Sequence, residues 1–542
     1  MSNSSSAFVK GAAILAITGI TARVIGAVFR IVLAAILGDE GIGLYQYAYP
    51  IYTTLLVIST AGIPVALSKI MAEKIALHDY REAIRVFRIA FILLTLSGLI
   101  ISLALLLGAE YIALFLVKDI KAVYPIIAIA PAIFFVTIMA SLRGFFQGQQ
   151  NMTPTAASQL LEQLVRVVFS IFLVIFLLPK GLEFAAAGAT SGAAAGGLAG
   201  LLMLAVLYWR KRHQLKALTE KQQEHSPDQT HRIIVRIFSL AVPVTIGGLV
   251  IPLITLIDLV VVPRQLQAAG FDLETARALY GQLTGMAGSV VYFPNVVALA
   301  LSISLVPAIS EAFALKKKVL IKSRTALAVK LTVLFSLPAT LGLFLLAEPI
   351  TVFLFNNADA GYALAYLSWS VIPLCLYVTT TGLIQGLGRP IIPALNMFYG
   401  GAVKTILAWH LTAVPSLNVG GAALASVVGI GVAAVFNLYY VFRFTGWRVN
   451  LRELAFLPGL AVGAMSVVVY FSYSLISRFG EPLLSAGRLN GIATLTAIIL
   501  GALIYIVVLL LTGALNREEL RMVPLIGPRL ANLLERLRFP SR

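Results

Sequence analysis

The chain has 542 residues, of which 59% are hydrophobic and 12% are charged, and its formal net charge is +18. A soluble globular domain carries about 25% charged residues, so the composition excludes a soluble protein. The charges leave apolar runs long enough to cross a bilayer, which takes about 20 residues each, and no alternating ten-residue segments typical of a membrane barrel are present. The sequence therefore predicts an all-α polytopic membrane protein.

Apolar runs predict about fourteen transmembrane helices along the chain. The segment before them, MSNSSSAFVK, is short and polar, and the run that follows is too long for the apolar region of a cleavable signal peptide. The predicted spans cover residues 8–37, 42–68, 84–107, 122–146, 155–178, 185–209, 233–262, 279–309, 325–346, 361–386, 392–412, 419–442, 454–477 and 490–513.

The longest polar segment between spans, residues 210–232, separates the sixth span from the seventh. It predicts two bundles joined by a linker. The expected domains are an N-terminal six-helix lobe at 1–210, a cytoplasmic linker at 211–232, a C-terminal six-helix lobe at 233–445, helices 13 and 14 at 446–515 and an amphipathic cytoplasmic tail at 516–542.

Lysine and arginine residues are distributed unevenly between the two sides of the predicted helices. Of the 41, one set of loops and termini holds 30, the opposite loops hold 7 and the spans hold 4. Because cytoplasmic loops carry the excess of positive charge, both termini are predicted to be cytoplasmic. The basic balance thus reflects orientation in the membrane, and no nucleic-acid partner is needed to explain it.

A short motif occurs once in each half of the chain. RGFFQGQQNMTPTA follows the fourth span and TGLIQGLGRPIIPA follows the tenth, so that Gln147 and Gly148 match Gln385 and Gly386 at an offset of 238 residues. At the same offset, Arg166 corresponds to Lys404. Since the offset covers six spans, an even number, the halves are predicted to form a parallel, pseudo-symmetric repeat.

Four cations lie within predicted spans: Arg23, Arg30, Arg166 and Lys404. Each costs about 2.5–3.5 kcal/mol at the bilayer centre on insertion scales, so each should face a wet cavity or a partner. Arg23 and Arg30 are seven residues apart and therefore share one helix face. Snorkelling to the interface is the alternative for Arg30, and ion pairing between helices is the alternative for Arg166 and Lys404.

Two acids lie well inside spans, and both are candidates for a counter-charge or for ion coupling. Glu162 is spaced for an i,i+4 pair with Arg166, and Asp258 lies in a span that also contains Pro243 and Pro252. A cavity with an excess of cations implies an anionic substrate. The planar fork of arginine suits phosphate and pyrophosphate.

The sequence shows no arrangement of residues typical of catalysis. It contains no phosphate-binding P-loop, no metal-ligand spacing, and a single cysteine, Cys375. We therefore expect a transporter rather than an enzyme, with no cofactor and no metal. Its driving force would be the membrane potential or a monovalent cation gradient.

Several of these stretches together resemble the MOP flippase superfamily, and in particular its group of MurJ-like and stage V sporulation protein B-like polysaccharide biosynthesis proteins. The first span, TARVIGAVFRIVLAAILG, is similar to the pattern of that group, although its two arginines are seven rather than six residues apart and Ile31 follows the second. GIPVALSKIMAE, FFQGQQNMTP, IQGLGRPIIP and VPLIGPRLANLLERL are similar to further motifs of the group.

The resemblance implies two six-helix lobes with an added helix pair, and a flippase for an undecaprenyl-pyrophosphate-linked sugar, above all the peptidoglycan precursor lipid II. It assigns pyrophosphate binding to Arg23 and Arg30. It also implies that the protein lies in the plasma membrane of a bacterium. The expected partners are the lipid substrate and membrane lipids, with cell-wall synthesis enzymes as further candidates, and a monomer suffices.

Four alternatives stay open from the sequence. They are a flippase for another lipid-linked oligosaccharide, a MATE-like multidrug exporter, a scaffold that recruits wall-synthesis enzymes, and an uncoupled lipid scramblase. The in-span excess of basic over acidic residues disfavours an exporter of organic cations, and the lack of long extra-membrane domains disfavours a scaffold.

Overall fold

The computed structural model describes residues 2–220, 228–447, 452–480 and 485–513. Every regular element in these ranges is helical, which confirms the predicted all-α class. Twelve helices are long and apolar enough to cross a membrane, or thirteen if one bent pair, Ala360–Ser368 with Val371–Gly386, is counted as a span. The two members of that pair are bent by 48°.

The difference from the predicted fourteen spans arises at the N-terminus. The first candidate span, Ile17–Ala76, has 60 residues. At 1.5 Å per residue it would be about 90 Å long, three times the hydrocarbon core of a bilayer. Helix α1 (Ser2–Thr60) is in fact interrupted at Gly38, where the backbone takes φ 68° and ψ −174°. The first two predicted spans therefore lie on the two sides of this break.

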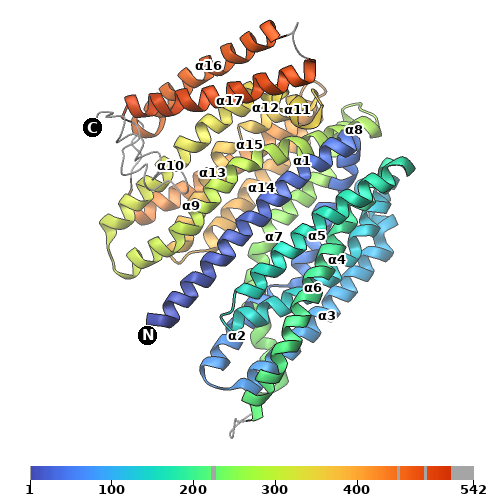
Figure 1. Cartoon of the computed structure of the whole chain (residues 1–542), viewed down its shortest axis with the longest axis vertical. Helices are drawn as coiled ribbons and strands as arrows, with labels where there is room; N and C mark the ends of the chain where they lie inside the picture. Colours follow the sequence, from blue (N-terminus) through green and yellow to red (C-terminus); the bar gives the residue numbers. More distant parts are fainter. Residues whose placement is uncertain (1, 221–227, 448–451, 481–484, 514–542) are drawn as a thin grey trace. The chain divides into compact units, whose positions relative to one another are not determined.

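The chain divides into two compact units, and each is described by itself. Unit 1 comprises residues 1–289 and 408–419. Its helices α3 to α6 run side by side in Figure 1, with α4 and α5 both packed on α6. After α1, its elements are α2 (Ile63–Ala76), α3 (Tyr80–Tyr111), η1 (Ile112–Val117), η2 (Ile120–Ala122), α4 (Val123–Gly148), α5 (Thr153–Leu177), η3 (Leu178–Lys180), α6 (Leu182–Glu220), α7 (Thr230–Ala268), α8 (Leu273–Gly281) and η4 (Gln282–Ala287).

The core of unit 1 is built on aromatic contacts between three helices. Phe87 of α3, Phe145 of α4 and Tyr208 of α6 lie with ring centroids 4.7–5.2 Å apart. Such tilted and edge-on pairs are favourable beyond the area they bury. Ile237 and Ala241 of α7 belong to the same buried cluster, so α7 packs into the core of unit 1.

Unit 2 comprises residues 290–407 and 420–542. The last two helices form an antiparallel pair in Figure 1 and are fixed to the rest of the unit by Tyr505, whose hydroxyl donates to the carbonyl of Leu334 at 2.6 Å. The elements are α9 (Gly288–Ala314), α10 (Lys318–Leu345), α11 (Ala347–Phe355), α12 (Ala360–Ser368), α13 (Val371–Gly386), α14 (Ile391–Leu411), α15 (Asn418–Thr445), η5 (Arg452–Phe456), α16 (Leu457–Gly480) and α17 (Ala486–Leu511).

The backbone repeats its unusual conformations at the offset of 238 residues. Three pairs of turn residues at this spacing all have positive φ: His78 and Lys316, Lys118 and Asn356, and Gln150 and Gly388. Most of these residues are not glycine, and a left-handed conformation is uncommon for other residues. The two halves of the chain therefore end corresponding helices with the same turns.

The Q-G motifs are packing sites in both units. A methyl group on Gly148 of α4 would lie 2.7 Å from Cβ of Met71 in α2, and one on Gly386 of α13 would lie 2.8 Å from Cβ of Ile309 in α9. Only glycine permits helices to approach this closely. Gly148 and Gly386 thus let α2 and α9 lie against corresponding helices of their own units.

Three predicted regions fall partly or wholly outside the described residues. The expected amphipathic tail at 516–542 lies wholly outside them, and so do residues 448–451, 481–484 and 514–515 of the expected helix pair and residues 221–227 of the expected linker. On either side of the latter, α6 continues to Glu220 and α7 begins at Thr230. The expected boundaries of the lobes and of the helix pair stay predictions.

Candidate functional site

The break in α1 brings its second half back against its first. Arg30 lies before the break and Tyr49 after it, and the Arg30 guanidinium stands 5.1 Å from the centroid of the Tyr49 ring. A side-chain hydrogen bond joins the same two residues. An arginine over an aromatic face is stabilised by the ring quadrupole. The break at Gly38, where φ is positive, therefore places Tyr49 beside Arg30, although the two residues are far apart in the sequence.

Arg23 and Arg30 lie on one side of α1, as their spacing predicts. Arg23 is exposed and Arg30 is partly buried. No carboxylate of the described residues lies within ion-pair distance of Arg23. Near it, the Gln163 side-chain amide of α5 donates to the carbonyl of Ala22 at 3.3 Å. This face of α1 therefore lies along α5.

Glu162 of α5 is the centre of a three-residue charged cluster. Its two carboxylate oxygens accept from Arg166 at 3.0 Å and from Arg143 at 2.9 Å. The three side chains are only 13–16% exposed. Arg143 also donates to the hydroxyl of Ser158 at 3.0 Å. The expected pair of Glu162 and Arg166 is present, and Arg143 of α4 is a second partner of Glu162 from another helix.

Three tyrosines of α1 connect the two arginine groups. The rings of Tyr45 and Tyr49 stack with centroids 5.8 Å apart, and Tyr52 lies 6.0 Å from Tyr49. Tyr52 in turn interacts electrostatically with Arg166. The tyrosine layer therefore extends from Arg30 to Arg166, and these two cations with Glu162 form one continuous polar site inside unit 1.

Small residues of α6 hold α5 in place behind this cluster. A methyl group on Gly196 would lie 3.1 Å from Cβ of Arg166 and would collide with the carbonyl of Glu162, and one on Gly192 would lie 2.7 Å from the carbonyl of Arg166. The glycines thus let α5 pack directly on the backbone of α6. This contact fixes the side of α5 that carries Glu162 and Arg166.

The remaining two predicted site residues lie elsewhere. Asp258 of α7 interacts electrostatically with Tyr280 of α8, in another part of unit 1. Lys404 belongs to α14 of unit 2, where it packs on α15: a methyl group on Gly429 would lie 2.5 Å from Cβ of Lys404. Arg166 and Lys404 therefore occupy similar positions in the two units, each against a glycine of the following helix.

A second charged cluster, which the sequence did not reveal, lies at the break of α1. Arg277 of α8 is 1% exposed, and its guanidinium donates to Asp119 at 2.6 Å and to Glu40. Lys121 lies 3.9 Å from Glu40. Asp119 and Arg277 are 158 residues apart, so no local pattern marks the pair. The cluster ties the Gly38 break to α8 and to the loop before α4.

Neither cluster resembles a metal centre. Among the described residues, no group of three His, Cys, Asp or Glu side chains could hold a metal ion. The first cluster holds two arginines and one carboxylate, and the second holds Arg277 and Lys121 with two carboxylates. The arrangement of Arg23, Arg30 and the tyrosines is suited to an anion with several oxygen acceptors, because arginine donates bidentately to phosphate.

Comparison with known proteins places the chain in a family. Residues 8–313 match the family model described as polysaccharide biosynthesis protein. The chain is 30% identical to stage V sporulation protein B of Bacillus subtilis (strain 168) over 523 residues, which cover 96% of this chain and 98% of that protein. It is 26% identical over 495 residues to the lipid II flippase MurJ of the same organism, covering 87% of this chain and 90% of that one.

Solved structures show the same fold at low identity. A structure of lipid II flippase MurJ in an inward closed conformation matches with a TM-score of 0.65 at 16% identity, over 91% of this chain and 97% of that one. An inward-facing multidrug resistance MATE family transporter of the MOP superfamily matches with a TM-score of 0.65 at 16% identity, over 78% and 94%. The chain belongs to the polysaccharide biosynthesis protein family and is a multi-span membrane protein with the fold of the MurJ and MATE structures.

Proposed function

We propose that this member of the polysaccharide biosynthesis family is a flippase that carries an undecaprenyl-pyrophosphate-linked sugar, lipid II above all, from the inner to the outer leaflet. The cationic face of α1 is the observation that carries the proposal. Arg23 is exposed in a helix of the membrane and lies beyond ion-pair distance of every carboxylate of the described residues. The relationship to MurJ of B. subtilis, at 26% identity over most of both chains, supports the same substrate class.

The energetics favour a ligand for this face. A guanidinium inside a membrane costs about 2.5–3.5 kcal/mol unless water or an anion solvates it. Arg166 and Arg143 both already pair with Glu162, which has one negative charge for the two guanidinium groups. Arg23 and Arg30 are the groups of this site that a pyrophosphate would join, with Tyr49 as a further hydrogen-bonding group beside Arg30.

The direction of transport follows from the charge of the substrate. An anion that moves outward across an inside-negative membrane gains about 2.3 kcal/mol per charge for each 100 mV. In the proposed cycle the headgroup enters an inward-open state, binds Arg23 and Arg30, and leaves after the lobes have opened outward. A monovalent cation gradient is the second candidate driving force, with Asp258 as a candidate coupling group.

The test is translocation of fluorescent lipid II in proteoliposomes by the wild type, Arg23→Ala and a control, Arg88→Ala. Arg88 is an exposed arginine of α3 outside the site. We expect the wild type and the control to translocate alike and Arg23→Ala to lose most of the rate with unchanged thermal stability. Equal rates for all three proteins would rule out the proposed site and leave the flippase activity intact.

Absence of lipid II transfer by the wild type, with transfer of another undecaprenyl-pyrophosphate sugar, would point to the alternative substrate. The likeness to MATE transporters is a reason to test organic cations in the same vesicles. The charges of unit 1 disfavour that function, because Glu162 is already engaged by two arginines and is therefore a poor ligand for a cationic drug.

A further inference from the structure

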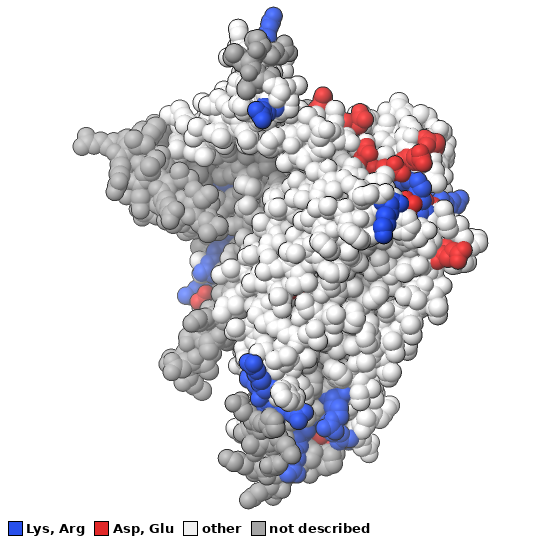
Figure 2. Space-filling view, turned by 45° about the vertical axis from the view of Figure 1, so that its right-hand side comes forward, with Lys and Arg blue, Asp and Glu red and all other residues white. Residues whose placement is uncertain are grey.

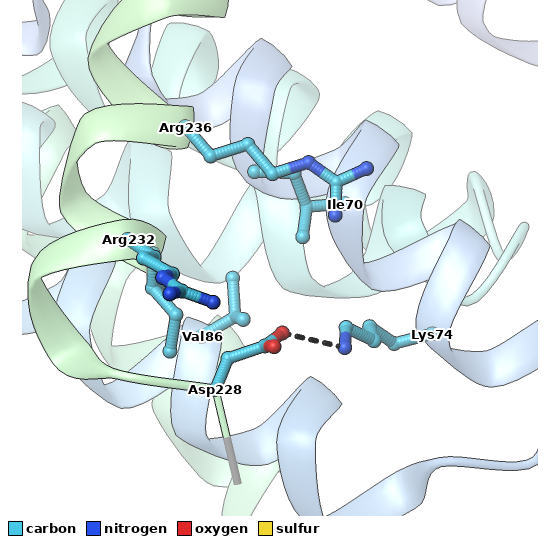
Figure 3. Close-up of a pocket in the computed structure, with 7 residues that line it drawn as sticks. Ile70, Lys74, Val86, Asp228, Arg232 and Arg236 are labelled. Atoms are coloured by element: carbon cyan, nitrogen blue, oxygen red, sulfur yellow. Dashed lines mark hydrogen bonds and ion pairs between the residues drawn. The ribbon is translucent and has the colours of Figure 1, made fainter.

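A separate cavity of about 290 Å³ lies in unit 1 where α2, α3 and the start of α7 meet. Its polar wall holds Lys74 of α2, Arg232 and Arg236 of α7, and Asp228 just before α7. Ile70, Val86 and Ile233 form its apolar wall. Figure 3 shows Arg232 and Arg236 reaching from α7 toward α2, while Asp228 is joined to Lys74. The volume is near the lower end of the range for ligand pockets.

Three of the cations around the cavity have carboxylate partners. Lys74 lies 2.8 Å from Asp228 and 3.6 Å from Asp79, and Arg236 pairs with Glu73. Arg85 lies 3.6 Å from the buried Glu82. For Arg232, no carboxylate of the described residues lies within ion-pair distance. The side chains that line the pocket itself are three cations, Lys74, Arg232 and Arg236, against one carboxylate, Asp228.

The backbone adds to this preference. The cavity lies at the N-terminus of α7, a helix of 39 residues whose N-cap, Gln229, makes no side-chain capping bond. The first N–H groups of such a helix favour a nearby anion. Arg85 donates to the carbonyl of Asp228 at 2.7 Å and to the hydroxyl of Thr230 at 2.8 Å, which fixes the position of the α7 start.

We propose that this pocket binds a singly charged phosphate group, such as the phosphodiester of an anionic membrane lipid, between Arg232 and Arg236. Three cations against one carboxylate in the lining favour an anionic group in this pocket. Exposed apolar side chains continue along α7 from the pocket, including Val235 at 51% and Val242 at 47% exposed, and would contact the lipid chains. Basic pockets between helices at the cytoplasmic surface are suited to anionic headgroups.

The location of the pocket differs from that of the proposed transport site. It involves none of Arg23, Arg30 or Glu162, so this inference does not depend on the flippase activity. Figure 2 shows mostly basic side chains at the lower end of the molecule, where lysines and arginines expose their charges. The Asp228 carboxylate lies on the same cavity and would repel the phosphate. Removing the charge of Arg232 should therefore weaken phosphate binding, and removing the charge of Asp228 should strengthen it.

The experiment counts bound short-chain phosphatidylglycerol on the full-length protein by native mass spectrometry, with phosphatidylcholine of the same chain length as the uncharged comparison. We expect phosphatidylglycerol to bind the wild type more tightly than phosphatidylcholine. Arg232→Gln should weaken its binding about 10- to 100-fold, the factor expected for one hydrogen bond to a charged group. Asp228→Asn should strengthen it, and Arg88→Gln, on the neighbouring helix α3 outside the pocket, should leave it unchanged.

A second arm uses inorganic phosphate in place of the lipid. Binding of inorganic phosphate that Arg232→Gln abolishes, with no preference for phosphatidylglycerol, would support the phosphate site with a soluble source. Equal lipid binding by the wild type, Arg232→Gln and Arg88→Gln would overturn the proposal. Parallel losses in Arg232→Gln and Asp228→Asn would also overturn it, because a purely structural role of the pocket predicts the same sign for both.

Discussion

Replacing Glu162 by glutamine tests whether the cluster at the centre of unit 1 is held by charge. The carboxylate accepts from Arg166 at 3.0 Å and from Arg143 at 2.9 Å, and all three side chains are 13–16% exposed. Removing one partner of a buried ion pair costs about 3–5 kcal/mol. Glutamine keeps one acceptor oxygen and the site keeps some exposure. We therefore expect a loss of about 3 kcal/mol in the free energy of unfolding, at the low end of this range.

The charge mechanism is separated from simple loss of packing by a double-mutant cycle. In the Glu162→Gln background, Arg143→Gln removes one of the two guanidinium groups that then face each other. The double variant should lose less than the sum of the single losses, with a coupling energy of about 1–3 kcal/mol. Unfolding is followed in mixed micelles with increasing sodium dodecyl sulfate, by the fluorescence of the four tryptophans.

A matched control is Glu311→Gln in α9. Its carboxylate lies 3.8 Å from Arg324 and its side chain is 67% exposed, so the change should stay within about 0.5 kcal/mol. Additive losses in the cycle, or a loss from Glu162→Gln no larger than that of the control, would refute the reasoning. The polar cluster would then contribute nothing through its charge to the packing of α4 on α5.

Three further predictions follow from local contacts. Gly148→Ala should lower the free energy of unfolding by about 1–3 kcal/mol, because the new methyl would meet Met71, whereas Gly108→Ala, with only one atom 4.0 Å away, should not; detergent unfolding measures both. Arg277→Gln should cost about 3–5 kcal/mol in the same assay, because it removes the guanidinium partner of the buried Asp119 at a position that is 1% exposed, while Lys121 stays beside Glu40. The hydrogen bond from Lys74 lowers the pKa of Asp228 below the ordinary value for an aspartate. The ion pair is therefore fully present at pH values above that ordinary pKa and is lost as the pH falls through the lowered pKa. We expect ¹³C chemical shifts to show Asp228 titrating at a higher pH in Lys74→Met than in the wild type.

The helical class and most span positions could be predicted from the sequence because membrane insertion depends on local composition. A run of about 20 apolar residues is sufficient evidence for a span, whatever it packs against. The shared face of Arg23 and Arg30 and the pair of Glu162 and Arg166 follow from helical periodicity alone. Both relationships lie within one helix, where the spacing of two residues along the sequence determines whether their side chains share a face.

The partners from other helices could not be predicted in this way. Arg143 reaches Glu162 across 19 residues and Arg277 reaches Asp119 across 158, and neither spacing has a periodic signature. Tyr49 comes to Arg30 because Gly38 breaks α1. The predicted spans 8–37 and 42–68 place a break at this point, but they do not reveal which side chains the break brings together. The backbone conformation of a single residue, Gly38, therefore determines which side chain lies beside the predicted site residue Arg30.

The repeat separates what the fold requires from what unit 1 adds. At the offset of 238 residues, Arg143 and Ser158 of unit 1 correspond to Thr381 and Asn396 of unit 2. In unit 1 these two positions bond directly and extend to Glu162. In unit 2, Asn437 bridges them with neutral groups, accepting from Asn396 at 2.8 Å and donating to Thr381 at 3.1 Å.

The position of Glu162 corresponds to Gly400, which cannot hold a charge. The glycine contacts of α4 and α13, by contrast, are present in both units. Corresponding helices are thus packed by the same close contacts in both units, with neutral groups and Lys404 in unit 2 and with three charges in unit 1. Since packing of this kind does not need the charges, and since desolvating them is costly, the fold alone does not account for them. Unit 1 differs from unit 2 in the electrostatic field that Glu162 and its two arginines create beside Arg30. We therefore expect recognition of an anion to take place beside this cluster.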